Sequence, residues 1–337
     1  MNKKTTDFKN LITNSESILL LSHANPDLDA VCSTLLLSHL INKHFKNKST
    51  TIIYQEKDWP RFSDYKIIDI EKINNLPDQT IDLSIYDLII ISDVDRLDRC
   101  LKNYIGYDGS SKKTVVIDHH NYADPDKPML YFNTNKASAV EEIYNIFQDM
   151  VGSDFKPDAK ISQYIQLGII ADSNRFLRNK VSTETYEIMT KTTKHHKLNL
   201  EAISKLMFGL NPNSIKILLD ILGNLEIKGS VAYSFISGKV EQNSKFTKDE
   251  LESAKHFFKD NFLLLIDGVD WGYLITSQAD PNRWTLRFRS ISNTVDVGKI
   301  AKLLGGGGHT NVSGAIVDGK SPKEVAQHIM KVAESMR

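Results

Sequence analysis

Short apolar runs recur along the first half of this 337-residue chain, and three of them lead directly into acidic or histidine side chains. Four runs have the length and composition of buried strands: ILLL from Ile18, TIIY from Thr51, LIII from Leu88 and TVVI from Thr114. Helical patterns such as Val31 to His44 separate them, and this alternation is typical of a parallel sheet with helices on its faces. We therefore expect an α/β fold whose N-terminal domain is a doubly wound parallel sheet.

The polar residues after these strands are of types that bind metal ions. They are His23, Asp27 and Asp29 after the first run, Asp93 after the third, Asp118, His119 and His120 after the fourth, and Asp172 at the end of the helical pattern from Ile161. Ligands of open α/β sheets bind outside the carboxyl ends of the strands. The topology therefore predicts that these side chains converge.

Carboxylate and imidazole together suit Mn²⁺, Fe²⁺, Co²⁺ or Zn²⁺ better than Mg²⁺. Two divalent ions would be balanced by four of these carboxylates, with neutral His23 and His119 completing the shells; the four are Asp27, Asp29, Asp93 and Asp172. Two ions roughly 3.5 to 4 Å apart can deprotonate a shared water and clamp a phosphoryl group. Taken singly, each Asp has an alternative interpretation as a turn or cap residue.

Adjacent side chains on an extended segment point in opposite directions, so His119 and His120 are expected to differ in role. If His119 is a metal ligand, His120 can contact the phosphate or protonate a leaving oxygen. Asp118 would then orient a ligand or a catalytic group.

The second half of the chain predicts a smaller α/β domain with a mixed sheet. Its strand patterns are VAYSFI, WGYLITSQ and WTLRFRS, and its helical patterns run from Lys248 to Lys259 and from Ser321 to Met336. We divide the chain into a catalytic domain over residues 1–182, a helical connector over 183–225 and a substrate-binding domain over 226–337.

Four glycines in LLGGGGHTNVSGAIV interrupt this second domain directly before His309. A glycine run can present backbone N–H groups to an anion, although by itself it is also a helix stop and linker. Arg287 and Arg289 share one face of the strand WTLRFRS, and arginine binds phosphate in a bidentate manner. We expect a substrate phosphate at Gly306, Gly307, Gly308 and His309, opposite the metal ions.

Composition limits the other partners. Lysine plus arginine and aspartate plus glutamate both number 42, so no global field favours long nucleic acid or an anionic membrane. Only Cys32 and Cys100 occur, no stretch is long enough to span a membrane, and no secretory leader is evident. We expect a soluble, cytoplasmic protein.

These motifs resemble those of the DHH phosphoesterase superfamily. HANPDLDA, SDVDRLDR, DHH and ADSNR resemble its four motifs in order, and GGGGHTNVSGA resembles the signature of the DHH-associated C-terminal domain. Size and C-terminal signature are most similar to the group of bifunctional oligoribonucleases and adenosine 3′,5′-bisphosphate (pAp) phosphatases.

The resemblance implies a hydrolase that cleaves short RNA to mononucleotides and pAp to AMP, by attack of a metal-bridging hydroxide on phosphorus, with two ions, usually Mn²⁺. It places His23, Asp27 and Asp93 around one ion and Asp29, Asp93, His119 and Asp172 around the other, with Asp93 bridging. It also implies that Arg289 and His309 hold a terminal phosphate or base-side group.

The sequence departs from the family pattern at Cys32, where Gly is frequent, and at Val312, where Ala is frequent. It also has Asp95 where a small residue is usual. The additional negative charge of Asp95 leaves open which aspartate bridges the two metal ions. Alternative functions are a standalone cyclic-dinucleotide phosphodiesterase and an inactive RNA-binding protein on the same scaffold. RecJ-type exonucleases are generally longer, and family II pyrophosphatases lack the glycine loop. The order of substrate preference stays open, as does a homodimer.

Overall fold

The computed structural model describes residues 1–57, 68, 70–107, 113–120, 128–178, 180–278, 280, 282–291 and 294–335. The chain forms two compact units, Met1–Met207 and Phe208–Arg337. Each unit has its own sheet and its own buried apolar core, so each is described separately.

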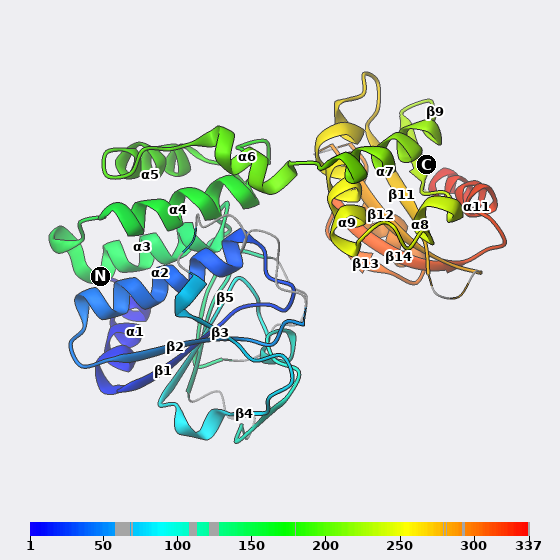
Figure 1. Ribbon diagram of the computed structural model, residues 1–337. Helices are drawn as coiled ribbons and strands as arrows, with labels where there is room; N and C mark the ends of the chain where they lie inside the picture. Colours follow the sequence, from blue (N-terminus) through cyan, green and yellow to red (C-terminus); the bar gives the residue numbers. More distant parts are fainter. Residues whose placement is uncertain are drawn as a thin grey trace. The chain divides into compact units, whose positions relative to one another are not determined.

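The first unit contains a six-stranded sheet in the order β3-β2-β1-β5-β7-β8, and every neighbouring pair is parallel (Figure 1). Its strands are β1 (Ser17–Leu21), β2 (Ser49–Tyr54), β3 (Ile73–Asn75), β5 (Leu88–Ser92), β7 (Thr114–Ile117) and β8 (Leu130–Phe132). The chain builds outward from β1 in one direction and from β5 in the other. The doubly wound parallel sheet expected from the sequence is confirmed, and β1 and β5 flank its switch point.

Long helices of this unit gather on one face of the sheet, where Figure 1 shows α2 to α5 as layers. They are α1 (Lys3–Asn14), α2 (Leu28–His44), α3 (Ala139–Val151), α4 (Ala159–Asp172), α5 (Thr183–Thr193) and α6 (Leu200–Phe208). Alternate strand residues such as Ile18 and Ile90 pack against them. The strand residues between, such as Leu19 and Ile91, pack against short 3₁₀ turns and the small pair β4 (Ile81–Asp82) and β6 (Tyr104–Ile105). Among the described residues, the second face thus carries no long helix.

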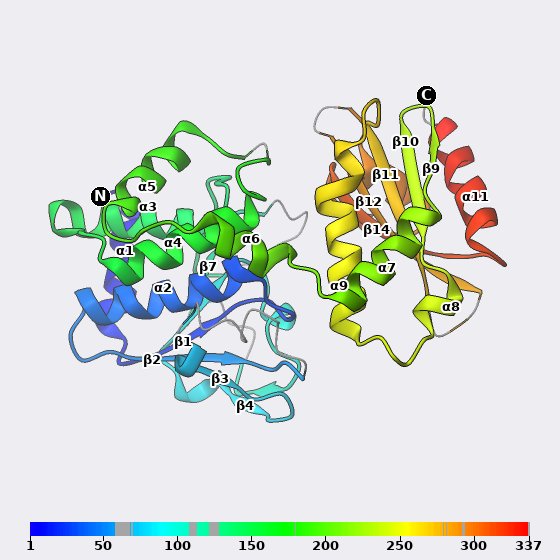
Figure 2. The ribbon, with the colours of Figure 1, turned by 45° about the horizontal axis from the view of Figure 1, so that its top comes forward.

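The second unit is a six-stranded mixed sheet in the order β13-β14-β12-β11-β10-β9. The strands are β9 (Glu226–Lys228), β10 (Val231–Phe235), β11 (Trp271–Ser277), β12 (Arg283–Ser290), β13 (Gly307–Gly308) and β14 (Val312–Asp318), of which only β10 and β11 are a parallel pair. Helices lie on both faces (Figure 2). One face packs on α10 (Val297–Leu303) and α11 (Pro322–Glu334), the other on α7 (Pro212–Gly223), α9 (Lys248–Phe257) and a π-helical turn, Phe258–Phe262; the short α8 (Gly238–Glu241) completes the unit.

Observed elements agree with the expected strands and helices to within a few residues, and the mixed C-terminal sheet is confirmed. The helical pattern expected to reach Met336 is seen to Glu334, and Met336 lies outside the described residues. The segment 183–225 is divided, because α5 packs on the first core and α7 on the second. No helix within the described residues is long and apolar enough to cross a membrane.

Candidate active site

The turn after β1 brings three of the expected ligands to the carboxyl edge of the first sheet. Asp27 caps the N-terminus of α2, where its Oδ1 accepts a hydrogen bond from the Ala30 N–H. Asp29 lies within the first turn of that helix and is fully buried. Nδ1 of His23 is 2.9 Å from the Ala24 carbonyl oxygen, which leaves Nε2 facing the sheet edge.

Asp93 lies at the centre of this edge. It directly follows β5 and adopts a left-handed backbone conformation with φ of 60°, which residues other than glycine rarely adopt. Its Oδ2 is 3.4 Å from Nε2 of His23, and its Oδ1 is 3.2 Å from Nε2 of His119. Each oxygen of one carboxylate therefore faces a different imidazole.

The segment Asp118–His120 follows β7, and its two histidine rings lie side by side, with centroids 4.1 Å apart, rather than on opposite sides of an extended segment. Nδ1 of His119 is 3.2 Å from the Lys136 carbonyl oxygen, so its Nε2 turns toward Asp93. His120 instead directs Nδ1 to Oδ1 of Asp118, at 2.9 Å. The same Asp118 oxygen accepts the backbone N–H groups of both histidines, so Asp118 fixes the turn and the His120 ring together.

Asp29 and Asp172 approach His119 from the helical side. Nε2 of His119 is 4.0 Å from Asp29 Oδ2 and 3.5 Å from Asp172 Oδ2. The Asp29 carboxylate also accepts hydrogen bonds from the Ala139 and Val140 N–H groups at the start of α3. Helix α4 comes close enough that a Cβ on Gly168 would lie 2.5 Å from Asp29 Oδ1. A glycine in α4 is therefore required for this arrangement.

The chain leaves α4 through three consecutive left-handed residues, Asn174, Arg175 and Phe176, with φ of 47°, 61° and 67°. Backbone strain of this kind clusters at functional sites, where the surrounding structure enforces it. Here it follows directly after Asp172, the last residue of α4.

The charges at this edge are strongly coupled. Burial lowers the pKa of His23, but the carboxylates of Asp93 and Asp27 outweigh it and raise that pKa to about 10. Burial also opposes protonation of His119, yet Asp172 and Asp93 raise its pKa to about 10. Despite its own burial, Asp93 has a pKa well below its usual range because both imidazoles face it. Burial and the Asp93 charge raise the pKa of Asp29 well above its ordinary value.

Two sets of potential metal ligands meet here in the described part of the chain. One contains His23, Asp27 and Asp93, the other Asp93, Asp118, His119 and His120, and Asp93 belongs to both. Asp93 Oδ1 and His119 Nε2 are buried and make no hydrogen bond. Buried polar atoms are normally satisfied, so these two atoms fit a cation that would occupy the space between them.

Asp95 does not join either set. Its buried carboxylate is 3.2 Å from Nη1 of Arg99, which offsets the additional charge at this edge. Asp93 is thus the aspartate that the two candidate ligand sets share.

Two cations beside the edge were missed by the sequence analysis. Nζ of Lys180 donates to the His119 carbonyl oxygen, and Nη1 of Arg178 is 3.4 Å from Asp172 Oδ1. Burial lowers the pKa of Lys180. The sequence signal for these two cations was their position a few residues after the ADSNR motif. The left-handed residues that follow Asp172 turn the chain back toward it.

In the second unit, the glycine run ends α10 and begins β13. The N–H groups of Gly305 and Gly306 donate to the Lys302 and Ala301 carbonyl oxygens, and that of His309 donates to the Val312 carbonyl oxygen. Gly306 therefore uses its N–H within the fold rather than as a donor to an anion. A Cβ on Gly306 would lie 2.2 Å from the Gly314 carbonyl oxygen, so close packing of β14 accounts for that glycine.

Arg289 lies on the α9 side of this sheet, and its side chain is 13% exposed. Its Nε donates to Oδ1 of Asp260 at 2.7 Å, and its Nη1 donates to the Phe288 carbonyl oxygen at 2.9 Å. His256 approaches the other Asp260 oxygen at 3.3 Å. Asp260, which the sequence analysis missed, thus fixes the guanidinium, while Val312 lies opposite Arg289 in the neighbouring strand.

Comparison with known proteins agrees with this geometry. Residues 17–171 match the DHH family, N-terminal domain. These residues form a DHH-family domain. The superfamily resemblance inferred from the motifs is confirmed, and the four motifs of this DHH domain lie at the sheet edge just described.

Several relatives are similar over most of both chains. The chain is 25% identical to the bifunctional oligoribonuclease and PAP phosphatase NrnA of Mycoplasma genitalium, over 94% of this chain and 93% of that protein. It is 23% identical to the protein of the same name from Bacillus subtilis, over 93% of each. An exopolyphosphatase-related protein from Bacteroides fragilis shares the fold, with a TM-score of 0.80, 19% identity and coverage of 99% and 97%.

The family match covers the strands and helices that carry this sheet edge, and the relatives are similar over nearly the whole chain. A divalent-metal site fits the carboxylates and imidazoles of its edge.

Proposed function

We propose that this protein is a Mn²⁺-dependent phosphoesterase that hydrolyses short oligoribonucleotides to mononucleotides and pAp to AMP. One observation carries the proposal: Asp93 directs one oxygen to His23 and the other to His119. A carboxylate between two imidazoles suits two neighbouring ions better than one. The relatives named as oligoribonucleases and PAP phosphatases support the choice of substrates.

In this proposal His23, Asp27 and Asp93 hold one ion, and Asp29, Asp93, His119 and Asp172 hold the other. Bound divalent ions supply an activated water and neutralise phosphoryl charge. Asp118 holds Nδ1 of His120, so Nε2 of that ring carries the proton exchange with the leaving oxygen. Arg178 and Lys180 offset the carboxylate charge beside Asp172.

Substrate selection belongs to the second unit in this proposal, where Asp260 holds Arg289 in one orientation. Gly307, Gly308 and His309 are exposed beside β14 and complete the surface for a terminal phosphate or nucleotide. With equal numbers of acidic and basic residues, the chain has no overall charge to favour long or duplex nucleic acid. We also propose a cytoplasmic location, because Cys32 and Cys100 are free thiols.

One substrate series in Mn²⁺ tests the proposal: pAp, a dinucleotide, a 5-mer, a 24-mer, cyclic-di-AMP and pyrophosphate, compared at equal enzyme concentration. We expect pAp and the short RNAs to be hydrolysed fastest. Faster cleavage of cyclic-di-AMP would assign the protein to the cyclic-dinucleotide phosphodiesterases. RNA binding with full metal content but no turnover of any substrate would mark an inactive RNA-binding protein.

A further inference from the structure

A cavity of about 170 Å³ lies in the second unit between α9 with its π-helical turn and the strands β11 and β12. It is lined by Glu252, Lys255, Lys259, Leu274, Thr276, Ser277, Thr285 and Arg287. Arg289 and the glycine loop are not part of the lining.

Regular structure builds this cavity. Glu252, Lys255 and Lys259 are spaced by three and four residues, so they share one side of the helix. On the sheet, Leu274 is paired with Arg287 and Thr276 with Thr285, so these side chains share one face. The lining is therefore fixed by a helix on one side and by paired strands on the other.

Two cationic side chains of the lining, Lys259 and Arg287, form no ion pair within the described residues. Lys259 is only 2% exposed, and its amine makes no hydrogen bond or ion pair within the described residues. The Arg287 side chain likewise has neither there. The Lys255 amine is 3.2 Å from the Glu252 carboxylate, so the charges of these two side chains offset each other. The adjacent acid, Asp260, is 2.7 Å from Arg289.

An unpaired buried ammonium is costly, and proteins normally pair such a group or shift its pKa. Burial is the main cause that lowers the pKa of Lys259 to about 8; the charges of Arg289 and Arg287 act in the same direction, and those of Asp260 and Glu252 act against it. The amine therefore sits where a negative charge would be favoured, with the Thr276 and Thr285 side chains beside it.

We propose that this cavity is a phosphoryl-binding site, in which Lys259 and Arg287 hold the anion. Two cations match a dianionic phosphate, and arginine can bind two of its oxygens at once. The cavity volume of about 170 Å³ is well above the roughly 10–15 Å³ of such space that one water molecule needs. A phosphoryl group fits this space, whereas an attached nucleoside would extend beyond it.

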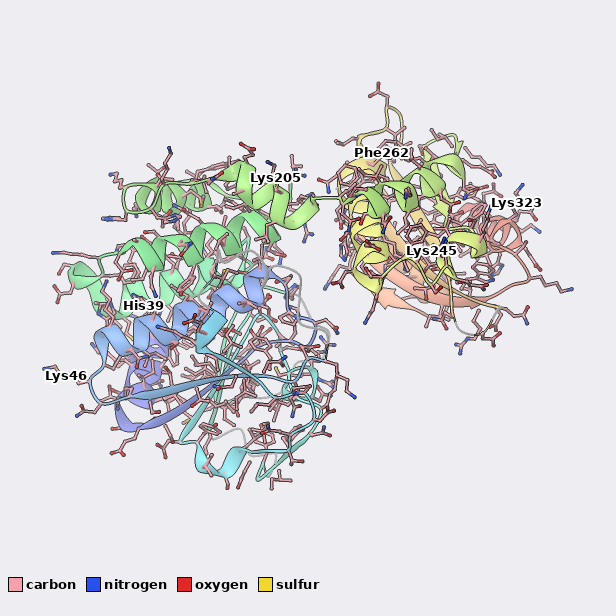
Figure 3. The ribbon with its side chains drawn as sticks, viewed as in Figure 1. His39, Lys46, Lys205, Lys245, Phe262 and Lys323 are labelled. Carbon is pink, nitrogen blue, oxygen red and sulfur yellow. The ribbon has the colours of Figure 1, made fainter. Side chains whose placement is uncertain are left out.

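Binding is tested first without turnover, in the full chain with EDTA. Inorganic phosphate is titrated into the wild type, Lys259→Met and Arg287→Met, and thermal unfolding reports the apparent Kd. Lys323→Met is the matched control, because Lys323 is exposed on α11 (Figure 3) and that helix packs on the opposite face of the sheet.

We expect the apparent Kd for phosphate to rise about tenfold or more in both cavity variants and to stay unchanged in the control. Unchanged binding in Arg287→Met and in a folded Lys259→Met would overturn the proposal. So would equal binding of acetate to the wild type at matched ionic strength. Because no turnover is involved, failure here is distinct from failure of the proposed hydrolysis.

A second arm identifies the source of the phosphate. KM is measured for one dinucleotide with a 5′-phosphate and the same dinucleotide with a 5′-hydroxyl. If the substrate supplies the phosphate, Lys259→Met and Arg287→Met raise KM only for the phosphorylated form. If free phosphate is the ligand, both KM values stay unchanged and any response of the rate to added phosphate is lost.

Discussion

The two units concentrate charge of opposite sign by different structural routes. In the DHH domain, carboxylates collect where parallel strands end, and strand order alone brings Asp93 and Asp118 to one edge. In the second unit, cations collect on a sheet face under a helix, where Lys259 and Arg287 come from separate elements. We propose that the first arrangement binds metal ions and that the second binds a phosphoryl group.

The largest effect is expected for Asp93→Ala, which removes the carboxylate common to both ligand sets. Activity should fall by about three orders of magnitude or more, and metal analysis should show both ions lost. Asp95→Asn is the control, because Asp95 pairs with Arg99 beside the same strand end. Retention of one ion in Asp93→Ala would mean that another residue bridges.

His120→Ala separates proton transfer from metal binding within one motif. We expect kcat to fall about a hundredfold, the usual scale for general acid–base groups, with metal content retained. Inductively coupled plasma analysis beside steady-state kinetics measures both. A metal-free variant would make His120 a ligand, an outcome that its place in the second ligand set allows.

Gly168→Ala tests how closely α4 must approach the edge. The added methyl group would meet Asp29 Oδ1 at 2.5 Å, so Mn²⁺ affinity should fall about tenfold. Gly223→Ala, at the end of α7, is the matched control because a Cβ there meets nothing within 4 Å. Equal metal titration curves for both variants would show that Asp29 can shift without loss.

Arg289→Ala tests whether selection resides in the second unit. KM for pAp and dinucleotides should rise about tenfold, while hydrolysis of bis-p-nitrophenyl phosphate persists. Asp260→Asn should give a smaller rise in the same direction because Asp260 orients the guanidinium. Asp249→Asn, exposed on α9, is the control. Equal loss on every substrate would contradict this division, as would faster trimming of a 24-mer than of a 3-mer.

The smallest effect concerns pH. His23 and His119 have pKa values of about 10 in the metal-free protein, above the ordinary value near 6.5. Their contribution to stability is complete below about pH 6.5 and is lost as pH rises toward 10. With EDTA, Tm should therefore fall as pH rises over this interval. Mn²⁺ competes with these protons, so its stabilisation should grow with pH; a Tm shift independent of pH would contradict both assignments.

The sequence predicted the residues at the carboxyl edge of the first sheet well, because one repeated pattern indicates both the strands and the acids that follow them. Each apolar run ends where its acid begins, so locating β5 and β7 also located Asp93 and Asp118. The sequence did not predict that one face of the first sheet carries no long helix among the described residues. A helical pattern does not indicate which face of a sheet the helix will cover. Lys259 and Asp260 were missed because, within a charged helical pattern, neither residue differs from ordinary solvent-facing positions. The π-helical turn carries both residues, of which Lys259 lines the cavity and Asp260 binds Arg289.

The left-handed backbone of Asp93 has a consequence for how this protein can change under selection. Glycine or asparagine at that position would relax the turn, but either would remove the carboxylate that both His23 and His119 face. Relief of backbone strain and loss of this ionic pairing therefore oppose each other at one residue. Selection for heat resistance alone thus has no simple way to relax this turn, even in the metal-free protein.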